Sequence, residues 1–249
     1  MPFSDREEKI LDILRRQGSA GADEMARELY ISRPTLRRDL IKLEQKGAVN
    51  RTHGGAKLTT RPADVTIPAS LRMDEDSRAK NMIAAEAAKL VRDGDTVMLD
   101  GSTSALHLAA AFRGKRDIVV ITSGARTALI LGEMGINTIC TGGQLICTSE
   151  SFIGSDAART ISCYNADTAF FSCRGLDAEG NLTDNSIGED IVRLEMMKRS
   201  RKSVLLLDSG KVGRRCLHNL CHVSEVDIII CDKPLPEDMR ALVGTAKRS

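Results

Sequence analysis

The sequence lacks any apolar run long enough to cross a bilayer as a helix. Its longest apolar stretches, such as SVLLLD (203–208) and DIIIC (227–231), have the length of β-strands. The opening segment MPFSDREEKILDIL also lacks the uninterrupted apolar core of a secretory signal, because charged residues interrupt it. We therefore expect a cytoplasmic protein of one or two domains that has no membrane partner.

A common zinc-binding pattern is also missing. The seven cysteines are odd in number, and most lie in apolar runs, so we expect reduced and mostly buried thiols. The segment CLHNLCH holds Cys216, His218, Cys221 and His222, which are conceivable metal ligands, but their spacing matches no common zinc site. We expect neither a metal nor a cofactor.

The chain has little net charge, but an excess of positive charge is concentrated in one segment. The formal net charge is only +2. Residues 32–57 contain 7 basic and 2 acidic side chains, whereas residues 1–31 contain 5 basic and 7 acidic ones. The remaining chain is close to neutral. A short basic segment near the N-terminus is therefore the candidate for contact with an anionic partner such as nucleic acid.

Three helices and a hairpin are predicted over residues 1–58. The first helix follows Ser4 and ends at Gly18, and ADEMARELY (22–30) has the apolar spacing of a second. A third begins at Ser32, a good N-cap, with Pro34 in its first turn. The pattern AVNRTHGGAKL (48–58) then predicts two strands joined by a Gly-Gly turn. This order of elements is typical of a winged helix-turn-helix domain.

The third predicted helix has an apolar face and a basic face. At about 100° per residue, Leu36, Leu40 and Leu43 fall on one side, and Thr35 and Arg38 fall on the opposite side. Such a helix suits the major groove, where side chains near its N-terminus reach base edges. We predict base contacts for Thr35 and Arg38, and we expect Asp39 to orient an arginine. Contacts to the DNA backbone are predicted for Ser32, Arg33, Arg37, Lys42, Arg51 and His53.

The composition changes after residue 58. Residues 59–73 contain two prolines and few periodic apolar residues, which is typical of a linker. Residues 74–249 alternate helical segments with near-continuous apolar strands, which predicts an α/β domain with a mostly parallel sheet. Several strands end in small or acidic residues, as in DGSTS, TSG, TGG and DSGK. Since open α/β sheets bind ligands beyond the carboxyl ends of their strands, we expect a binding site there.

The segment SRPTLRRDLIKLEQKGAVNRTHGGAKL resembles the recognition helix and wing of the DeoR family of bacterial transcriptional regulators. The similarity continues through Arg72 and KNMIAAEAAKLVRDGDTVMLDGSTS to DSGKVG, over nearly the whole chain. The resemblance implies a homodimeric or homotetrameric repressor that binds double-stranded operator DNA. It also implies a C-terminal domain that resembles ribose-5-phosphate isomerase and CoA-transferase folds and binds a phosphorylated sugar. The matching residues are Thr35, Arg37, Arg38, Asp39 and Leu40 in the helix, and Arg51, His53, Gly54, Gly55 and Ala56 in the wing.

The first predicted effector contact is the turn in LDGSTSALHL, between a strand end and a helix start. Backbone N–H groups and hydroxyls at a helix N-terminus form a cradle for phosphate. We assign this role to Gly101, Ser102, Thr103 and Ser104, whereas Asp100 positions the loop or meets a sugar hydroxyl. An ordinary hydroxyl-rich helix cap is the alternative interpretation. The loop is similar to the family's D-x-G-T-T loop, with Ser102 where the family often has glycine.

Other predicted effector contacts lie at further strand ends. Thr122 and Ser123 resemble the family's T-N segment, with serine in place of asparagine. Lys211 of DSGKVG can meet a phosphate or a sugar oxygen, or it can be a solvated surface residue. Glu189 is a ligand candidate or simply a helix N-terminal charge. Asp177 is expected to line the same crevice.

Two classes of function remain open from the sequence. We favour a repressor of a sugar-utilisation operon in which effector binding changes the geometry between subunits, so that no catalysis is required. The alternative is a sugar-phosphate isomerase-like enzyme with an appended DNA-binding module, which would need a carboxylate base and a polarising group. Glu189, Asp177 and Lys211 could supply these groups.

Overall fold

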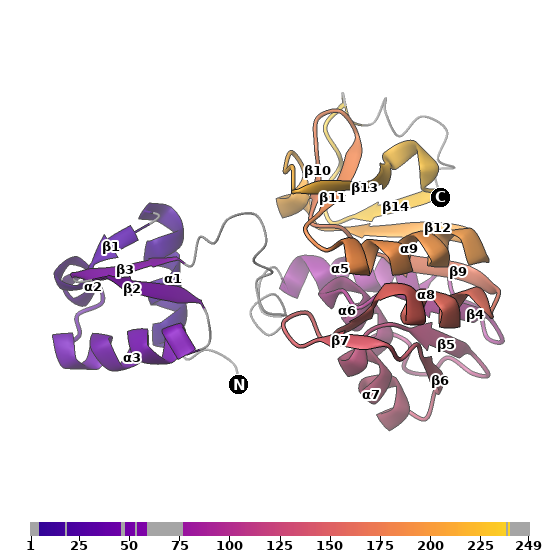
Figure 1. Cartoon of the computed structure of the whole chain (residues 1–249), viewed down its shortest axis with the longest axis horizontal. Helices are drawn as coiled ribbons and strands as arrows, with labels where there is room; N and C mark the ends of the chain where they lie inside the picture. The colour runs from indigo at the N-terminus through magenta and orange to yellow at the C-terminus, as the bar shows by residue number, and fades with distance from the viewer. Residues whose placement is uncertain are drawn as a thin grey trace. The chain divides into compact units, whose positions relative to one another are not determined.

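The computed structural model describes residues 5–17, 19–45, 48–52, 54–58, 77–237 and 239. The chain forms two compact units that divide after residue 71, and each unit is described by itself (Figure 1). The predicted linker, 59–73, lies outside the described residues, as does His53. No helix in the described part of the chain combines the length and the apolar character needed to cross a membrane.

The first unit contains the three predicted helices and a small antiparallel sheet of order β1-β3-β2. Its elements are α1 (Asp5–Gln17), β1 (Ser19–Gly21), α2 (Ala22–Glu28), α3 (Arg33–Gln45), β2 (Val49–Thr52) and β3 (Gly55–Leu58). Only β1 was not predicted, because three residues are too few to show an alternating pattern. The winged helix-turn-helix prediction is confirmed.

The core of the first unit holds the face of α3 that the sequence predicts to be buried. Leu36, Leu40 and Leu43 are at most 4% exposed, and they pack with apolar residues of α1 and α2. The hairpin closes against β1 at Gly55, where an added Cβ would overlap the carbonyl oxygen of Ala20. Glycine is therefore required for this close approach of two strands.

The second unit is built on a six-stranded parallel sheet of order β14-β12-β9-β4-β5-β6 (Figure 1). All six strands lie in residues 74–249, where the sequence predicts strands that alternate with helices, so the predicted parallel α/β domain is confirmed. The strands are β4 (Thr96–Leu99), β5 (Val119–Thr122), β6 (Asn137–Cys140), β9 (Ala166–Phe171), β12 (Ser200–Leu207) and β14 (Ile228–Cys231). The helices are α5 (Ser77–Ala88), α6 (Thr103–Ala110), α7 (Ala125–Glu133), α8 (Gly154–Ser162) and α9 (Ile187–Arg199).

Both faces of this sheet are covered. Alternate residues of β4 face opposite sides, so that Val97 and Leu99 pack with α5 and α6, whereas Met98 packs with α8 and α9. A third cluster forms where the small antiparallel sheet β10-β11-β13 packs on β12. The remaining elements are β7 (Gln144–Ile146), β8 (Ser151–Ile153), β10 (Gly175–Leu176), β11 (Asn181–Asp184), β13 (His218–His222) and the 3₁₀ helices η1 (Ser209–Lys211) and η2 (Val223–Glu225).

The expectation that most thiols are buried is wrong. Cys140, Cys147 and Cys163 are exposed, and only Cys173 is buried among the seven free cysteines. The reason is that β6 lies at the edge of the sheet, and Cys147 and Cys163 lie beyond the ends of strand and helix segments. Burial raises the pKa of the Cys173 thiol to about 12.

Candidate functional site

The outer face of α3 presents basic side chains to solvent. Arg37, Arg38 and Lys42 are exposed, and Thr35 is half-buried at the first turn. The Ser32 hydroxyl accepts a 3.4 Å hydrogen bond from the Thr35 backbone N–H and lies 2.9 Å from the Thr35 hydroxyl. Ser32 is thus the predicted N-cap, and the start of α3 is fixed by its own side chains.

Carboxylates hold two of the arginines predicted to contact the DNA backbone. Arg33 pairs with Asp23 at the start of α2. The wing residue Arg51 lies 3.6 Å from the Glu44 carboxylate of α3, which also accepts its backbone N–H at 3.2 Å. These pairs connect α2 to α3 and α3 to the wing, and both arginines line the same groove.

The prediction that Asp39 orients an arginine is confirmed. Asp39 is 2% exposed and accepts two hydrogen bonds from Arg6 of α1, at 2.6 Å and 3.1 Å. The hydrogen bonds to Asp39 raise the pKa of Arg6 above its ordinary value. The acidic residue of α3 therefore faces α1, and Arg6 compensates its negative charge, which would otherwise repel DNA.

A groove lies between α3 and the wing. The start of α2 and the Gly54–Gly55 turn complete its lining. Its charged residues are Asp23, Arg33, Arg37, Glu44 and Arg51. Predicted DNA contacts from the helix and from the wing therefore line one continuous depression.

In the second unit, polar residues gather at the carboxyl edge of the parallel sheet. Asp100 follows β4, Ser123 follows β5, Ser172 follows β9 and Asp208 follows β12. All four are at most 5% exposed. The sequence predicted this convergence, because the carboxyl ends of parallel strands meet at one edge.

The predicted phosphate loop forms the N-terminus of α6. The Ser102 hydroxyl accepts the Ala105 N–H at 3.1 Å, and the Asp100 carboxylate accepts the Ser102 N–H at 3.1 Å. Gly101 is pressed against β8, where an added Cβ would overlap Ser151. Thr103 and Ser104 are buried in the first turn of α6. Asp100 therefore positions the loop, as one of its two predicted roles requires.

The neighbouring strand end is built in the same way. The Thr122 hydroxyl accepts the Gly124 N–H at 3.0 Å. Ser123 is 3% exposed, and its carbonyl oxygen accepts the Phe152 N–H at 2.7 Å. Both residues lie beside the loop of Gly101, since the Ser123 N–H donates to the carbonyl oxygen of Leu99.

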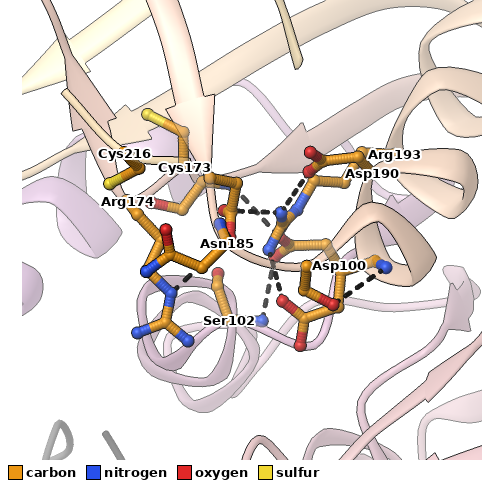
Figure 2. Close-up of polar contacts among 12 residues, drawn as sticks. Asp100, Ser102, Cys173, Arg174, Asn185, Asp190, Arg193 and Cys216 are labelled. Atoms are coloured by element: carbon orange, nitrogen blue, oxygen red, sulfur yellow. Dashed lines mark hydrogen bonds and ion pairs between the residues drawn. The ribbon is translucent and has the colours of Figure 1, made fainter. Parts of the chain in front are cut away.

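A buried arginine that the sequence reasoning missed is the centre of this site (Figure 2). Arg193 of α9 donates to Asp184 at 2.8 Å, to Asp190 at 2.7 Å, to Asp100 at 2.9 Å and to Glu189 at 3.3 Å. Its side chain is 6% exposed. Glu189 is thus both a first-turn acidic residue and a member of the cluster. We call these five residues the Arg193 cluster.

The protonation of the Arg193 cluster follows from burial and charge. Burial opposes the charged form of Arg193, but the four carboxylates outweigh burial and raise its pKa well above the ordinary value. Burial also disfavours ionised Asp184, yet Arg193 and Arg174 hold its pKa below the ordinary value. For Asp190, burial dominates and raises the pKa.

Lys211 joins the cluster through Ser172. Its ammonium group donates to the Ser172 hydroxyl at 2.9 Å and pairs with Asp208 at 3.0 Å. The Ser172 N–H in turn donates to Asp100 at 3.2 Å. The structure therefore brings together Asp100, Glu189 and Lys211, three of the predicted effector residues. With a 19% exposed side chain, Lys211 is not a solvated surface residue.

Asp177 is placed elsewhere. It lies in the turn between β10 and β11, where its carboxylate accepts the backbone N–H groups of Glu179 and Asn181. Burial opposes its ionisation, but the hydrogen bond from the Asn181 side chain, these backbone bonds and the charge of Arg215 lower its pKa below the ordinary value. The length of β11 separates this turn from Asp184 of the Arg193 cluster. The structure does not place Asp177 in the crevice where it was expected, because its carboxylate oxygens accept hydrogen bonds within the turn between β10 and β11.

The CLHNLCH segment is not organised around a metal. His218 pairs with Asp190 at 3.1 Å, and the His222 ring meets Ser224 and the carbonyl oxygen of Glu179. Among the residues that the structure describes, no group of three or more His, Cys, Asp or Glu side chains is arranged to hold a metal ion.

Several buried polar atoms around this edge of the sheet lack a hydrogen-bond partner. Within the described residues they are Ser104 Oγ, Ser149 Oγ, Arg174 Nη2, Asp190 Oδ2 and His218 Nε2. Of these, Asp190 Oδ2 has no hydrogen bond of good geometry but lies 3.1 Å from Nδ1 of His218. Ser149 lies two residues before Ser151, which packs on Gly101, and Arg174 pairs with Asp184 at 3.6 Å. Because buried polar groups are nearly always satisfied, these atoms indicate where a polar ligand or ordered water completes the site.

Comparison with known proteins identifies the family. Residues 6–61 match the DeoR-like helix-turn-helix domain, and residues 75–233 match the DeoR C-terminal sensor domain. The chain belongs to the DeoR family. It is a DNA-binding transcriptional regulator with a sensor domain, as the sequence resemblance implied.

Full-length relatives support this assignment. The chain is 34% identical to the transcriptional regulator GolR of Listeria innocua, over 94% of this chain and 92% of that protein. It is 30% identical to a putative aga operon repressor of Escherichia coli O157:H7, over 94% and 88%. It is also 30% identical to the L-fucose operon activator of Haemophilus influenzae, over 94% of each. These relatives are regulators, so the isomerase alternative is not favoured.

Ribose-5-phosphate isomerase A of Methanocaldococcus jannaschii is a distant structural match. Its TM-score is 0.42 at 17% identity, over 55% of each chain. The likeness concerns the fold alone.

Proposed function

We propose that this regulator represses a carbohydrate-utilisation operon and that a phosphorylated sugar bound at the Arg193 cluster changes its affinity for operator DNA. The protein acts as a homodimer or homotetramer. The observation that supports the effector site best is the set of buried polar atoms without partners at the carboxyl edge of the parallel sheet. Relatives named for the aga and L-fucose operons support a carbohydrate signal.

The charges of the site support a ligand with two chemically different ends. Five carboxylates, Asp100, Asp184, Glu189, Asp190 and Asp208, surround three cationic groups, Arg174, Arg193 and Lys211. These eight groups together therefore carry a net negative charge, and the carboxylates among them repel a phosphate. Arg174 Nη2 lacks a hydrogen-bond partner and can donate to a hydroxyl group, and Asp190 Oδ2, which lies 3.1 Å from Nδ1 of His218, can accept from one.

The phosphate belongs at the N-terminus of α6. Backbone N–H groups and the helix dipole favour an anion there, and the unpartnered Ser104 hydroxyl can donate to it. Lys211, which follows β12, adds a positive charge; β9 lies between β12 and β4, the strand that leads into α6. In this assignment Gly101, Ser102, Thr103 and Ser104 hold the phosphate, while Thr122 and Ser123 border the sugar.

DNA recognition rests on the exposed face of α3. Thr35 and Arg38 read base edges, and Arg37 and Lys42 contact phosphates from the same helix. Ser32, Arg33, Arg51 and His53 meet the DNA backbone. The Arg33–Asp23 and Arg51–Glu44 pairs support this assignment, since they hold both guanidinium groups on the surface that bears the recognition helix.

The deciding experiment titrates the purified protein against DNA from upstream of its own coding region, with random DNA as competitor. Glucose 6-phosphate, fructose 1-phosphate, ribose 5-phosphate and similar compounds are added one at a time. We expect specific binding that one sugar phosphate releases. Specific binding that no sugar phosphate alters would contradict the effector site, and equal binding to random DNA would contradict the operator assignment.

Two variants test the assigned residues. Lys211→Ala should keep operator affinity and lose the response to the sugar phosphate. Lys202→Ala, which changes an exposed lysine of β12, the strand that precedes Lys211, should keep both. Arg38→Ala should weaken binding to operator DNA by about 1–3 kcal/mol and relax sequence preference. An equal loss on random DNA would assign Arg38 to a phosphate instead.

A further inference from the structure

Helix α9 exposes a row of aliphatic side chains although it buries charged ones. Its buried residues are Glu189, Asp190 and Arg193 together with the apolar Val192 and Met196. Ile187, Ile191 and Leu194 are 64%, 43% and 44% exposed. These three residues are spaced i, i+4 and i+7, so they form one stripe along the outside of the helix. We call Ile187, Ile191 and Leu194 the outer stripe. A surface helix normally has the opposite arrangement, with its aliphatic residues facing the core.

The outer stripe is part of a larger apolar area. Leu217 is 54% exposed, and its N–H donates to the Asn185 side chain at 3.1 Å, which places it beside the start of α9. The exposed large hydrophobic residues described in the second unit are Met82, Leu129, Leu145, Ile187, Ile191, Leu194 and Leu217. Four of these seven therefore lie on or beside α9. Apolar side chains that gather in one place on a surface indicate an interface.

The charges around the stripe determine which partner fits. Helix α8 packs beside α9 on the same face of the sheet (Figure 1). Each helix directly precedes a strand of the parallel pair β9 and β12, so the two helices run in the same direction. Asp156 is acidic in the first turn of α8, and Lys198 and Arg199 are basic in the last turn of α9. One end of the layer thus carries an exposed carboxylate, Asp156, which also pairs with Arg159 of α8 at 3.1 Å. The other end carries an exposed ammonium group, Lys198, which lies 3.9 Å from Glu195 of α9.

This arrangement is complementary to a second copy of itself. When a second α9 lies antiparallel across a two-fold axis beside Ile191, Ile187 of each copy meets Leu194 of the other. The same rotation brings Lys198 of one copy, 71% exposed, toward the acidic end that carries Asp156, 68% exposed, of the other. The helix dipoles are also antiparallel.

We propose that the outer stripe of α9 is the interface between two copies of this chain. The opposite face of the same helix carries Glu189, Asp190 and Arg193 of the Arg193 cluster. A ligand that rearranges this cluster shifts α9, and a shift of α9 changes how the two subunits are oriented. Because paired recognition helices must match the spacing of two half-sites, such a change alters operator affinity. This coupling, unlike the interface itself, rests on the proposed effector site.

The interface is tested with Ile191→Glu. Because the site is exposed, the variant should fold normally, with an unchanged circular dichroism spectrum. Sedimentation of the full chain over a range of concentrations should show self-association weakened by roughly ten-fold or more, since a charge is buried against an apolar partner. Leu129→Glu, at a 69% exposed leucine of α7, is the matched control and should associate like the wild type. Unchanged association of Ile191→Glu, or a loss only in Leu129→Glu, would overturn the proposal.

A second variant does not depend on destabilising the interface. Ile191→Cys, made in a chain whose exposed Cys140, Cys147 and Cys163 are replaced by serine, should form a cross-linked dimer on mild oxidation, because residue 191 lies beside the two-fold axis. Leu129→Cys in the same background should remain uncross-linked. Equal cross-linking of the two variants would overturn the geometry. Neither experiment uses an effector, so their outcome is independent of the sugar-phosphate titration.

Discussion

The most demanding test of the buried charge network is Arg193→Met. Methionine fills a similar volume but leaves Asp100, Asp184, Glu189 and Asp190 without their shared cation. Removing one partner of a buried ion pair typically costs about 3–5 kcal/mol. Here one cation serves four carboxylates that are at most 7% exposed, so we expect the upper end of this range. Since a domain is stable by only about 5–15 kcal/mol, the second unit should become marginal at neutral pH.

The loss in Arg193→Met should shrink as the pH falls. Without the guanidinium, the buried carboxylates have pKa values above those of the unfolded chain, so the folded variant binds protons and gains stability on acidification. In the wild type, Asp184 has a lowered pKa, and its contribution is present above the unfolded pKa and is lost as the pH falls. The first effect narrows the difference between the two proteins as the pH falls from neutral toward the raised pKa values of the variant, whereas the second adds to it only below about pH 4, where an unfolded aspartate begins to bind a proton.

Urea unfolding followed by circular dichroism measures this effect, because the chain contains no tryptophan. The control is Arg201→Met, whose arginine is 85% exposed and should matter by less than about 0.5 kcal/mol. The first unit contains no member of the cluster, so its unfolding should not change. A loss below about 1 kcal/mol in Arg193→Met, or a loss that does not change between pH 7.5 and 5.5, would refute the electrostatic argument.

Three further predictions concern local structure. Tyr30 has φ +53° and is 96% exposed, so Tyr30→Gly should raise the free energy of unfolding of the first unit by about 1 kcal/mol; a lower melting temperature would contradict this. Ser102→Ala removes the N-cap of α6 and should cost the second unit about 1 kcal/mol in urea unfolding, whereas an unchanged midpoint would deny the cap a stabilising role. At pH 8, iodoacetamide should label exposed Cys140, Cys147 and Cys163 in the native protein and spare Cys173, whose pKa of about 12 keeps it protonated; mass spectrometry showing early labelling of Cys173 would contradict its burial.

Most of the architecture could be predicted from the sequence because it depends on local periodicity. Leucines at helical spacing in α3, and unbroken apolar runs in the six parallel strands, each need only a few neighbouring residues to be recognised. Strands β1, β7, β8 and β10 were missed because two or three residues give no period. Strands β11 and β13 were missed because neither NLTD nor HNLCH is an apolar run. Asp177 was placed in the crevice only because it follows an apolar run, and no local pattern shows that a turn occupies its carboxylate.

The sequence by itself determined that basic residues share one face of α3 and that Asp100, Ser123 and Lys211 follow strands of one sheet. Both properties are set by the geometry of a helix or of parallel strands. Only the tertiary structure showed that Arg193 of α9 donates hydrogen bonds both to Asp100 at the end of β4 and to Asp184 at the end of β11. A helical wheel of α9 would turn Ile187, Ile191 and Leu194 inward, because burial of aliphatic residues is the usual preference. The buried carboxylates reverse that preference: Arg193 must face them to compensate their charge, and this orientation of the helix leaves the aliphatic stripe outside.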